Sequence, residues 1–128
     1  MAFTGNWKVS NFEEEKLNKA LDAFGIPASE RDRNMVLKAA VDIKQDGDSF
    51  TMNATGGLGK HGTHTFKVGD SIEGALFGKK YQGTTSWNGD KVVFKGKSGM
   101  VLTRSIEGSN MIYTIEYGGN GGRIVFSK

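Results

Sequence analysis

The chain has 128 residues, with 17 basic and 14 acidic side chains and a formal charge of +3. This length indicates one domain over residues 1–128, and the small, dispersed excess of positive charge argues against a nucleic-acid partner. Cysteine is absent, which excludes disulfides and thiolate metal sites. The sequence contains no apolar run of membrane-spanning length and no signal-peptide pattern at its start, so we expect a soluble, cytoplasmic protein.

The first 34 residues predict one strand followed by two helices. Phe3–Ser10 alternates loosely and indicates a strand. Ser10 or Asn11 can cap a helix whose first turn is acidic, and Gly25 ends that helix. A second short helix is predicted over Ala28–Asn34, after a proline that suits a first turn. The apolar stripe of the first helix comprises Leu17, Ala20, Leu21 and Phe24.

From Met35 onward the pattern is strand and turn throughout. Glycine makes up 19 of the 128 residues, and short glycine-containing turns separate the apolar runs, so neighbouring strands must be antiparallel hairpins. The predicted strands are Leu37–Lys44, Ser49–Ala54, Thr63–Val68, Ser71–Phe77, Tyr81–Trp87, Lys91–Lys95, Met100–Ile106, Met111–Tyr117 and Arg123–Ser127.

These elements predict an all-β fold of ten antiparallel strands, with the helices inserted between the first and second strands. A flat meander of ten strands has two exposed edges, so the sheet should close into an up-and-down barrel with the helices as a lid. Only 37% of the residues are hydrophobic, and several inward rows carry polar side chains. We therefore expect an interior that is partly a solvated cavity able to hold a small ligand.

Arg104 is the least ordinary residue of the predicted interior. It stands between Leu102 and Ile106, its neighbours on the same face at a period of two. Most arginines are solvated and outward, which is the alternative here. An inward, dry and unpaired guanidinium would cost several kcal/mol, a cost that a watery cavity receiving an acidic ligand removes.

Several motifs resemble, in order and at matching spacing, those of the intracellular lipid-binding proteins, the fatty-acid-binding protein family. They are Gly5–Val9 with Asn11–Glu13, Phe24–Ile26, Gln45–Thr51, Phe66–Gly69 and Trp87–Val93. The resemblance covers essentially the entire chain. It implies a ten-stranded clam-like barrel, capped by a helix–turn–helix, that holds fatty acid in a water-containing cavity.

The resemblance also implies a carboxylate site. Many members hold the carboxylate with an arginine on the eighth strand, where Arg104 falls, and with an Arg-x-Tyr pair on the last strand. Counting from Arg104 without a gap, Ile124 and Phe126 stand where that pair would be, and Arg123 points outward unless the glycine-rich turn slips by one residue. A tyrosine of inward parity on the ninth strand, Tyr113 or Tyr117, could supply a hydroxyl instead.

Apolar walls and a lid complete the expected site. The walls comprise Leu102, Ile106, Ile115, Ile124 and Phe126. By resemblance, Met35, Leu58 and Phe77 border the ligand portal, although ordinary packing of lid on barrel explains them equally well. Basic lid residues could make transient contact with anionic membranes, or simply form a solvated face. They are Lys16, Lys19, Arg31 and Arg33.

Other sites are not supported. Gly57–Gly62 fits G-x-G-x-x-G but precedes a strand rather than a helix, so it is not a dinucleotide site. His61 and His64 should lie on opposite faces, and Asp46 and Asp48 lack the rest of a calcium loop, so no metal or cofactor is expected. No catalytic triad is visible, which argues against an enzyme.

We therefore expect a monomeric, non-catalytic carrier of long-chain fatty acids or similar amphipathic carboxylates. A bile-acid or retinoid carrier of the same fold is the first alternative. A glutamine in place of Arg104 would have indicated retinol, by resemblance, so an acidic ligand is preferred. A small lipid-modifying enzyme is a more distant alternative.

Overall fold

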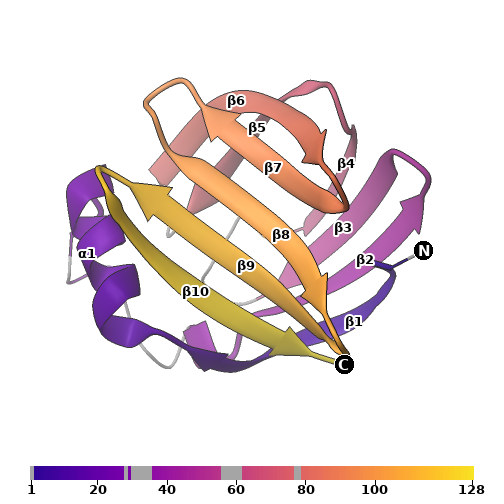
Figure 1. The fold of residues 1–128 in the computed structure, drawn as a ribbon, viewed down its shortest axis with the longest axis horizontal. Coiled ribbons are helices and arrows are strands. Elements are labelled where there is room, and N and C mark those ends of the chain that lie inside the picture. The colour runs from indigo at the N-terminus through magenta and orange to yellow at the C-terminus, as the bar shows by residue number, and fades with distance from the viewer. Residues whose placement is uncertain (1, 28, 30–35, 56–61, 77–78) are drawn as a thin grey trace.

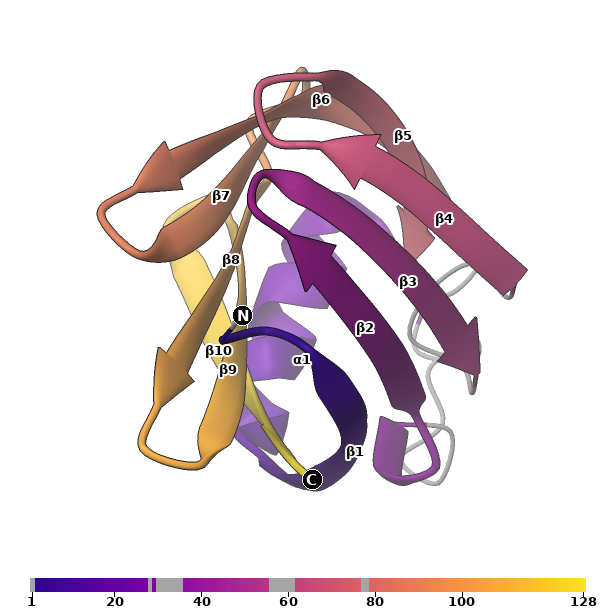
Figure 2. The same cartoon turned by 90° about the vertical axis from the view of Figure 1, so that its right-hand side faces the viewer.

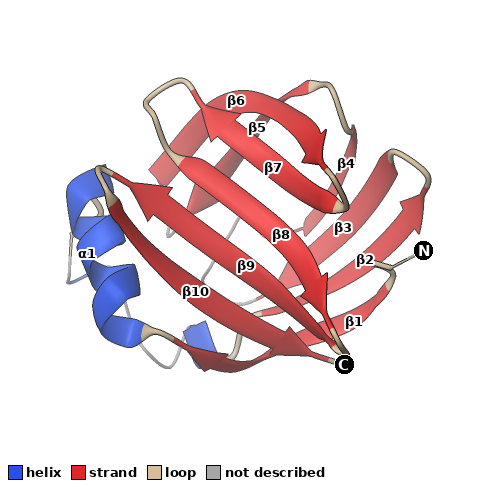
Figure 3. Cartoon of the chain, viewed as in Figure 1, coloured by secondary structure: helices blue, strands red, loops and turns tan. Residues whose placement is uncertain are grey.

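The structure is a computed structural model that describes residues 2–27, 29, 36–55, 62–76 and 79–128. It has ten strands, with one multi-turn helix after the first (Figure 3). The helix is α1 (Glu14–Phe24). The strands are β1 (Gly5–Phe12), β2 (Ala40–Asp46), β3 (Ser49–Thr55), β4 (Gly62–Lys67), β5 (Ser71–Leu76), β6 (Lys79–Asn88), β7 (Lys91–Gly96), β8 (Val101–Glu107), β9 (Asn110–Tyr117) and β10 (Asn120–Ser127). The predicted ten-stranded, all-β fold is confirmed.

The ten strands form one antiparallel sheet that curls on itself. Their order is β4-β3-β2-β1-β10-β9-β8-β7-β6-β5, so each strand pairs with its sequence neighbour except at two places. The first strand pairs with the last, which joins the two halves of the meander. β4 and β5 are the two edges, and the turned view shows the sheet bringing them to the same side of the molecule (Figure 2). The result is the nearly closed barrel of Figure 1.

Helix α1 covers one end of the barrel with the predicted apolar stripe. Its four buried residues are Leu17, Ala20, Leu21 and Phe24. Gly25 ends the helix in the left-handed conformation at φ 93°, and its N–H donates to the Asp22 carbonyl. The helix packs against β10 and β9. A Cβ on Gly122 would collide with the backbone of Leu17, so the close approach of α1 to β10 requires glycine there.

The predicted start of the helix was wrong. Ser10 and Asn11 lie in β1, which runs on to Phe12, and the helix begins at Glu14 without a side-chain cap. The register between β1 and β10 shifts between Val9 and Asn11, and the Ser10 hydroxyl donates to the Val125 carbonyl. The pairing with β10 thus keeps these polar residues extended, because a strand partner overrides a local capping preference.

The predicted strand Leu37–Lys44 also begins later than expected. Val36 and Leu37 are helical, and β2 starts at Ala40. The N–H of Ala39 donates to the carbonyl of Val36, which closes this helical turn before the strand. Of the predicted second helix, Ala28–Asn34, only Ser29 is among the described residues.

The turn between β9 and β10 fixes which side of the last strand faces inward. It consists of Gly118 and Gly119, both at positive φ, which suits a tight two-residue hairpin. Pairing then runs without a slip from Asn120 opposite Tyr117 to Ser127 opposite Asn110. Ile124 is fully buried and Arg123 is exposed, as the gapless count predicted.

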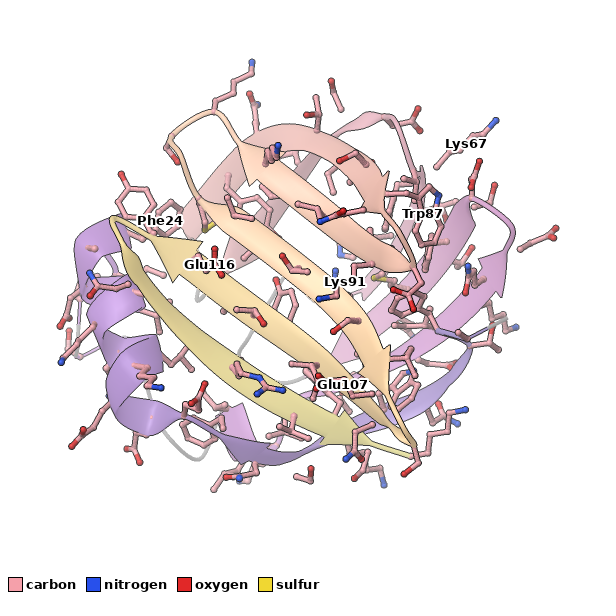
Figure 4. All side chains as sticks on the ribbon, in the orientation of Figure 1. Phe24, Lys67, Trp87, Lys91, Glu107 and Glu116 are labelled. Carbon is pink, nitrogen blue, oxygen red and sulfur yellow. The ribbon has the colours of Figure 1, made fainter. Side chains whose placement is uncertain are left out.

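An aromatic cluster lies away from the helix. Phe3, Phe50, Phe66 and Trp87 form a chain of ring contacts at centroid distances of 5.3 to 6.4 Å. The indole Nε1 of Trp87 donates to Asp48 Oδ1 at 2.8 Å, which ties the end of β6 to the β2–β3 turn. In Figure 4, Trp87 lies on the right of the molecule and Phe24 of α1 lies on the left. These rings therefore pack the barrel at a distance from the helical cover.

Candidate head-group site

Arg104 lies on β8 with its side chain among buried neighbours. It pairs with Val92 on β7 and with Tyr113 on β9. Its guanidinium carbon lies 4.4 Å from the centroid of the Tyr113 ring, a cation–π contact. Val92 and Tyr113 are each 5% exposed. The predicted inward orientation of Arg104 therefore agrees with the structure, and the guanidinium lies against a buried ring.

The Nε of Arg104 has an unusual environment. Within the described part of the chain, it is the one buried side-chain nitrogen or oxygen without a hydrogen-bond partner. No ion pair among those residues includes Arg104. An unsatisfied buried donor costs about 1–3 kcal/mol, and more when the group is charged. The described residues therefore supply no acceptor for this cationic donor.

Two tyrosine hydroxyls lie near this cation. Tyr113 on β9 and Tyr81 on β6 are close enough for each phenol to influence the pKa of the other. Burial raises the pKa of both phenols above their ordinary value, while the positive charge of Arg104 opposes that rise. Both hydroxyls are therefore protonated at neutral pH and able to donate.

Tyr81 was missed by the sequence reasoning. It begins a predicted strand, and its partly buried ring packs edge-to-face on Phe94 at 5.0 Å. Its same-face neighbours on β6, Gly83 and Thr85, are both buried. This alternation was the signal that could have identified Tyr81 as inward. Its distance in sequence from Arg104 concealed the connection between them.

The predicted apolar walls lie in the hydrophobic core. Four of them are buried, with 0% exposure for Ile115 and Ile124, 3% for Leu102 and 5% for Phe126. Ile106 is partly buried and packs against the same core. Ile124 lies directly opposite Tyr113 in the β9–β10 ladder. Tyr113 thus has an apolar neighbour on β10 that offers no hydrogen bond.

The other predicted tyrosine lies elsewhere. The Tyr117 ring packs edge-to-face on Phe24 of α1, at a centroid distance of 5.4 Å. It stands four residues beyond Tyr113 along β9, which is about 13 Å in an extended strand. Tyr117 therefore contributes to the packing of the helical cover, and Tyr113 is the hydroxyl that the fold places beside Arg104.

Arg123 has an outward, structural role. Its guanidinium donates to Glu107 Oε2 at 2.7 Å, and both side chains are substantially exposed. Figure 4 shows Glu107 near the end of the β8–β9 hairpin. The backbone of Arg123 also exchanges hydrogen bonds with Glu13, which anchors the start of α1. These partners explain why the last strand brings no second arginine into the interior.

The predicted portal residues Met35, Leu58 and Phe77 lie outside the described residues, as do Arg31 and Arg33 of the lid. Lys16 and Lys19 are exposed on α1, and Lys16 pairs with Glu13 at 3.3 Å. None of the described helices is both long and apolar enough to cross a membrane.

The structure describes part of each motif that the sequence analysis considered and set aside. Gly62, the last residue of the G-x-G-x-x-G match, begins strand β4 rather than a helix. His64 pairs with Met52 across the β3–β4 ladder, and His61 lies outside the described residues. Asp48 accepts the indole hydrogen bond from Trp87. In the described ranges, no three histidine or acidic side chains group as a metal site would require.

Comparisons with known proteins agree with the fold. A family model described as the lipocalin / cytosolic fatty-acid binding protein family matches residues 1–124. Gastrotropin from Oryctolagus cuniculus is 28% identical over 120 residues, which is 93% of this chain and 91% of the relative. The liver-type fatty acid-binding protein of Epinephelus coioides is 26% identical over 122 residues, 94% of each.

Solved structures show the same architecture. Human cRBP IV superposes with a TM-score of 0.80 at 24% identity, over 98% of this chain and 97% of that one. The REP1-NXSQ fatty acid transporter has a TM-score of 0.82 at 17% identity, over 98% and 94%. At these sequence identities, the structural similarity supports the fold only. The match of the family model over residues 1–124 shows that the chain belongs to the lipocalin / cytosolic fatty-acid binding protein family.

Proposed function

We propose that this protein binds long-chain fatty acids, or similar amphipathic carboxylates, inside the barrel and carries them through the cytoplasm as a monomer. The carboxylate lies against Arg104 and the hydrocarbon tail lies among the apolar walls. The observation that supports this most directly is the buried Nε of Arg104, which lacks a partner among the described residues. A carboxylate supplies both the charge and the acceptor that this donor lacks.

Magnitudes assign different roles to tail and head. At about 0.8 kcal/mol per buried methylene, a long acyl chain contributes on the order of 10 kcal/mol before ordering costs. A charge-assisted hydrogen bond contributes roughly 1.5–3 kcal/mol. The tail therefore sets most of the affinity, while Arg104 sets orientation and the preference for an acid. A neutral alcohol or ester would leave the guanidinium without its counter-ion, which disfavours a retinol-like ligand.

The mechanism requires no chemical step. Enclosure removes the tail from water, and release reverses the same contacts, so we expect no turnover of a bound lipid. We also infer that α1, with the exposed Lys16 and Lys19, meets anionic membranes during transfer. Transfer of a fluorescent fatty acid should then be faster to anionic vesicles than to neutral ones. Equal rates would contradict the membrane contact but not the binding.

The binding test is calorimetry on delipidated protein, with palmitate and with the alcohol of the same chain length. We expect Arg104→Ala to weaken palmitate roughly ten- to hundred-fold and to leave the alcohol nearly unchanged. Arg123→Ala is the matched control, because that guanidinium pairs with Glu107 on the outside. Equal losses for acid and alcohol would refute the role of Arg104. A bile acid and a retinoid acid, added as competitors, establish which kind of acid binds best.

A further inference from the structure

Strands β4 and β5 follow one another in the chain, yet over the residues that the structure describes they do not pair. They are the two ends of the strand order, and β4 pairs with β3 while β5 pairs with β6. Residues 68–70 join the two strands, and in Figure 2 this turn lies next to the tip of the β2–β3 hairpin. We call the line between the unpaired edges of β4 and β5 the seam.

The turn changes its hydrogen-bond partner between two adjacent residues. The N–H of Val68 donates to the Asp48 carbonyl at 2.8 Å, which continues the pairing of β3 with β4. The N–H of Gly69 instead lies 3.1 Å from both the carbonyl and the hydroxyl oxygen of Thr85 on β6. Thr85, which is 4% exposed, donates its own N–H to the Asp70 carbonyl at 3.0 Å. The chain therefore passes from one strand pair to the other at Val68 and Gly69.

Gly69 has the backbone freedom that a hinge requires. Its φ is 109°, a conformation that residues with a side chain rarely adopt, and a Cβ built there would meet nothing within 4 Å. Hinges are short loop positions that absorb a change in backbone dihedral angles. A change at Gly69 would turn the β3–β4 pair relative to the β5–β6 pair, and the seam would widen.

Trp87 of β6 crosses the seam beside this turn. Its Nε1 donates to Asp48 Oδ1 at 2.8 Å. Its ring contacts Phe3 and Phe50 at centroid distances of 6.4 and 6.1 Å. Asp48 immediately precedes β3 and Phe50 lies on it, so these contacts hold the β5–β6 pair against the β3–β4 pair. The Trp87 side chain is 36% exposed, so the link lies at the surface, where one hydrogen bond is a weak and reversible restraint.

We propose that the Trp87–Asp48 hydrogen bond keeps the seam closed, and that opening at Val68 and Gly69 sets how fast the barrel exchanges its ligand. The part that concerns ligand rests on the proposed function, whereas the opening is a property of the empty barrel as well. Because the same bond closes the empty and the filled barrel, its loss should speed ligand entry and ligand release by the same factor. The affinity should then stay unchanged.

The first test measures exchange rates by stopped flow, with a fluorescent fatty acid and full-length, delipidated protein. Asp48→Ala removes the acceptor, and Trp87→Phe removes the donor but keeps an aromatic ring. We expect both variants to raise the association and dissociation rates about two- to ten-fold, with little change in Kd. Asp48→Asn is the matched control, because its amide oxygen still accepts the indole hydrogen bond, and it should exchange ligand at the wild-type rates.

The second test needs no ligand. Fluorine NMR of protein labelled with fluorotryptophan follows both indoles, and relaxation dispersion detects opening on the microsecond to millisecond timescale. Asp48→Ala should increase the dispersion at Trp87 relative to wild type and Asp48→Asn. Trp7 is the internal reference, because it is 1% exposed and donates to the Phe3 carbonyl, so its signal should not change. Nitrogen-15 dispersion should be largest at Val68 and Gly69.

The outcomes separate this inference from the proposed function. Unchanged rates and unchanged Trp87 dispersion in Asp48→Ala, with melting showing that the variant is folded, would overturn the inference. Faster release without faster entry would also overturn it, because the bond would then contribute to affinity. Acceleration by Asp48→Asn would exclude the hydrogen bond as the cause, and dispersion spread evenly over β4 and β5 would exclude the hinge. If no fatty acid binds, the proposed function is wrong, and the NMR measurement still decides whether the seam opens.

Discussion

Replacing Arg104 with methionine should stabilise the ligand-free protein. The substitution removes a buried charged donor that has no hydrogen-bond partner among the described residues. The unsatisfied donor costs about 1–3 kcal/mol. Against this, the variant loses the cation–π contact with Tyr113, worth about 0.5–2 kcal/mol. Methionine is unbranched and flexible enough to pack beside Leu102 and Ile106. The net expectation is a gain of about 1 kcal/mol, because the apolar replacement also removes a desolvated charge.

Bound palmitate should reverse the order of the two melting temperatures, so that the wild type is no longer less stable than Arg104→Met. For a domain of this size, about 1 kcal/mol corresponds to roughly 3–6 °C in melting temperature. Palmitate at a hundred times the wild-type Kd adds about 2.7 kcal/mol to the wild type. At the same concentration, a variant that binds ten- to hundred-fold more weakly gains only about 0.4–1.4 kcal/mol. The wild type should therefore draw level with the variant or overtake it once acid is present.

Calorimetric melting of both delipidated proteins, with and without palmitate, measures this directly. Arg123→Met is the matched control, since it removes an arginine of the exposed ion pair with Glu107, which is worth at most about 1 kcal/mol. It should lower the melting temperature slightly in both conditions. The reasoning would be refuted if ligand-free Arg104→Met melted below wild type, because the guanidinium would then be stabilising the empty barrel.

Two further predictions concern the scaffold. Gly122→Ala should destabilise the fold by about 1–3 kcal/mol, because the new methyl collides with the Leu17 backbone and displaces α1, and urea titration measures this. Gly121→Ala is the control and should have little effect, because its methyl comes closest to the flexible Glu116 side chain and makes only an ordinary contact with the Ile115 carbonyl. Stability should also fall as pH rises above 10.0, the ordinary tyrosine pKa, because the unfolded chain releases phenol protons that buried Tyr81 and Tyr113 keep. Urea titrations at pH 8 and 11 should show a smaller fall in the Tyr81→Phe, Tyr113→Phe double variant, and an equal fall would contradict the assignment.

Local sequence was enough for most of the fold. The period-two alternation and the glycine turns predicted ten strands, and parity placed Arg104 inward and Arg123 outward. This succeeded because each strand's inward face is set by its own apolar residues, and a two-residue turn such as Gly118-Gly119 transmits register without a slip. Local reasoning failed at Ser10 and Asn11, where pairing with β10 extends the strand past residues that could cap a helix.

The sequence by itself thus determined the strands, their antiparallel order and an inward cation on β8. Only the tertiary structure decided which side chains lie near the guanidinium of Arg104. Parity allowed either Tyr113 or Tyr117, and the packing of Tyr117 on Phe24 of α1 separated them. Tyr81 and Tyr113 influence each other's pKa only because the sheet curves enough to bring side chains three strands apart near one another. Alternation along a strand is encoded locally, whereas curvature results from the packing of all ten strands together.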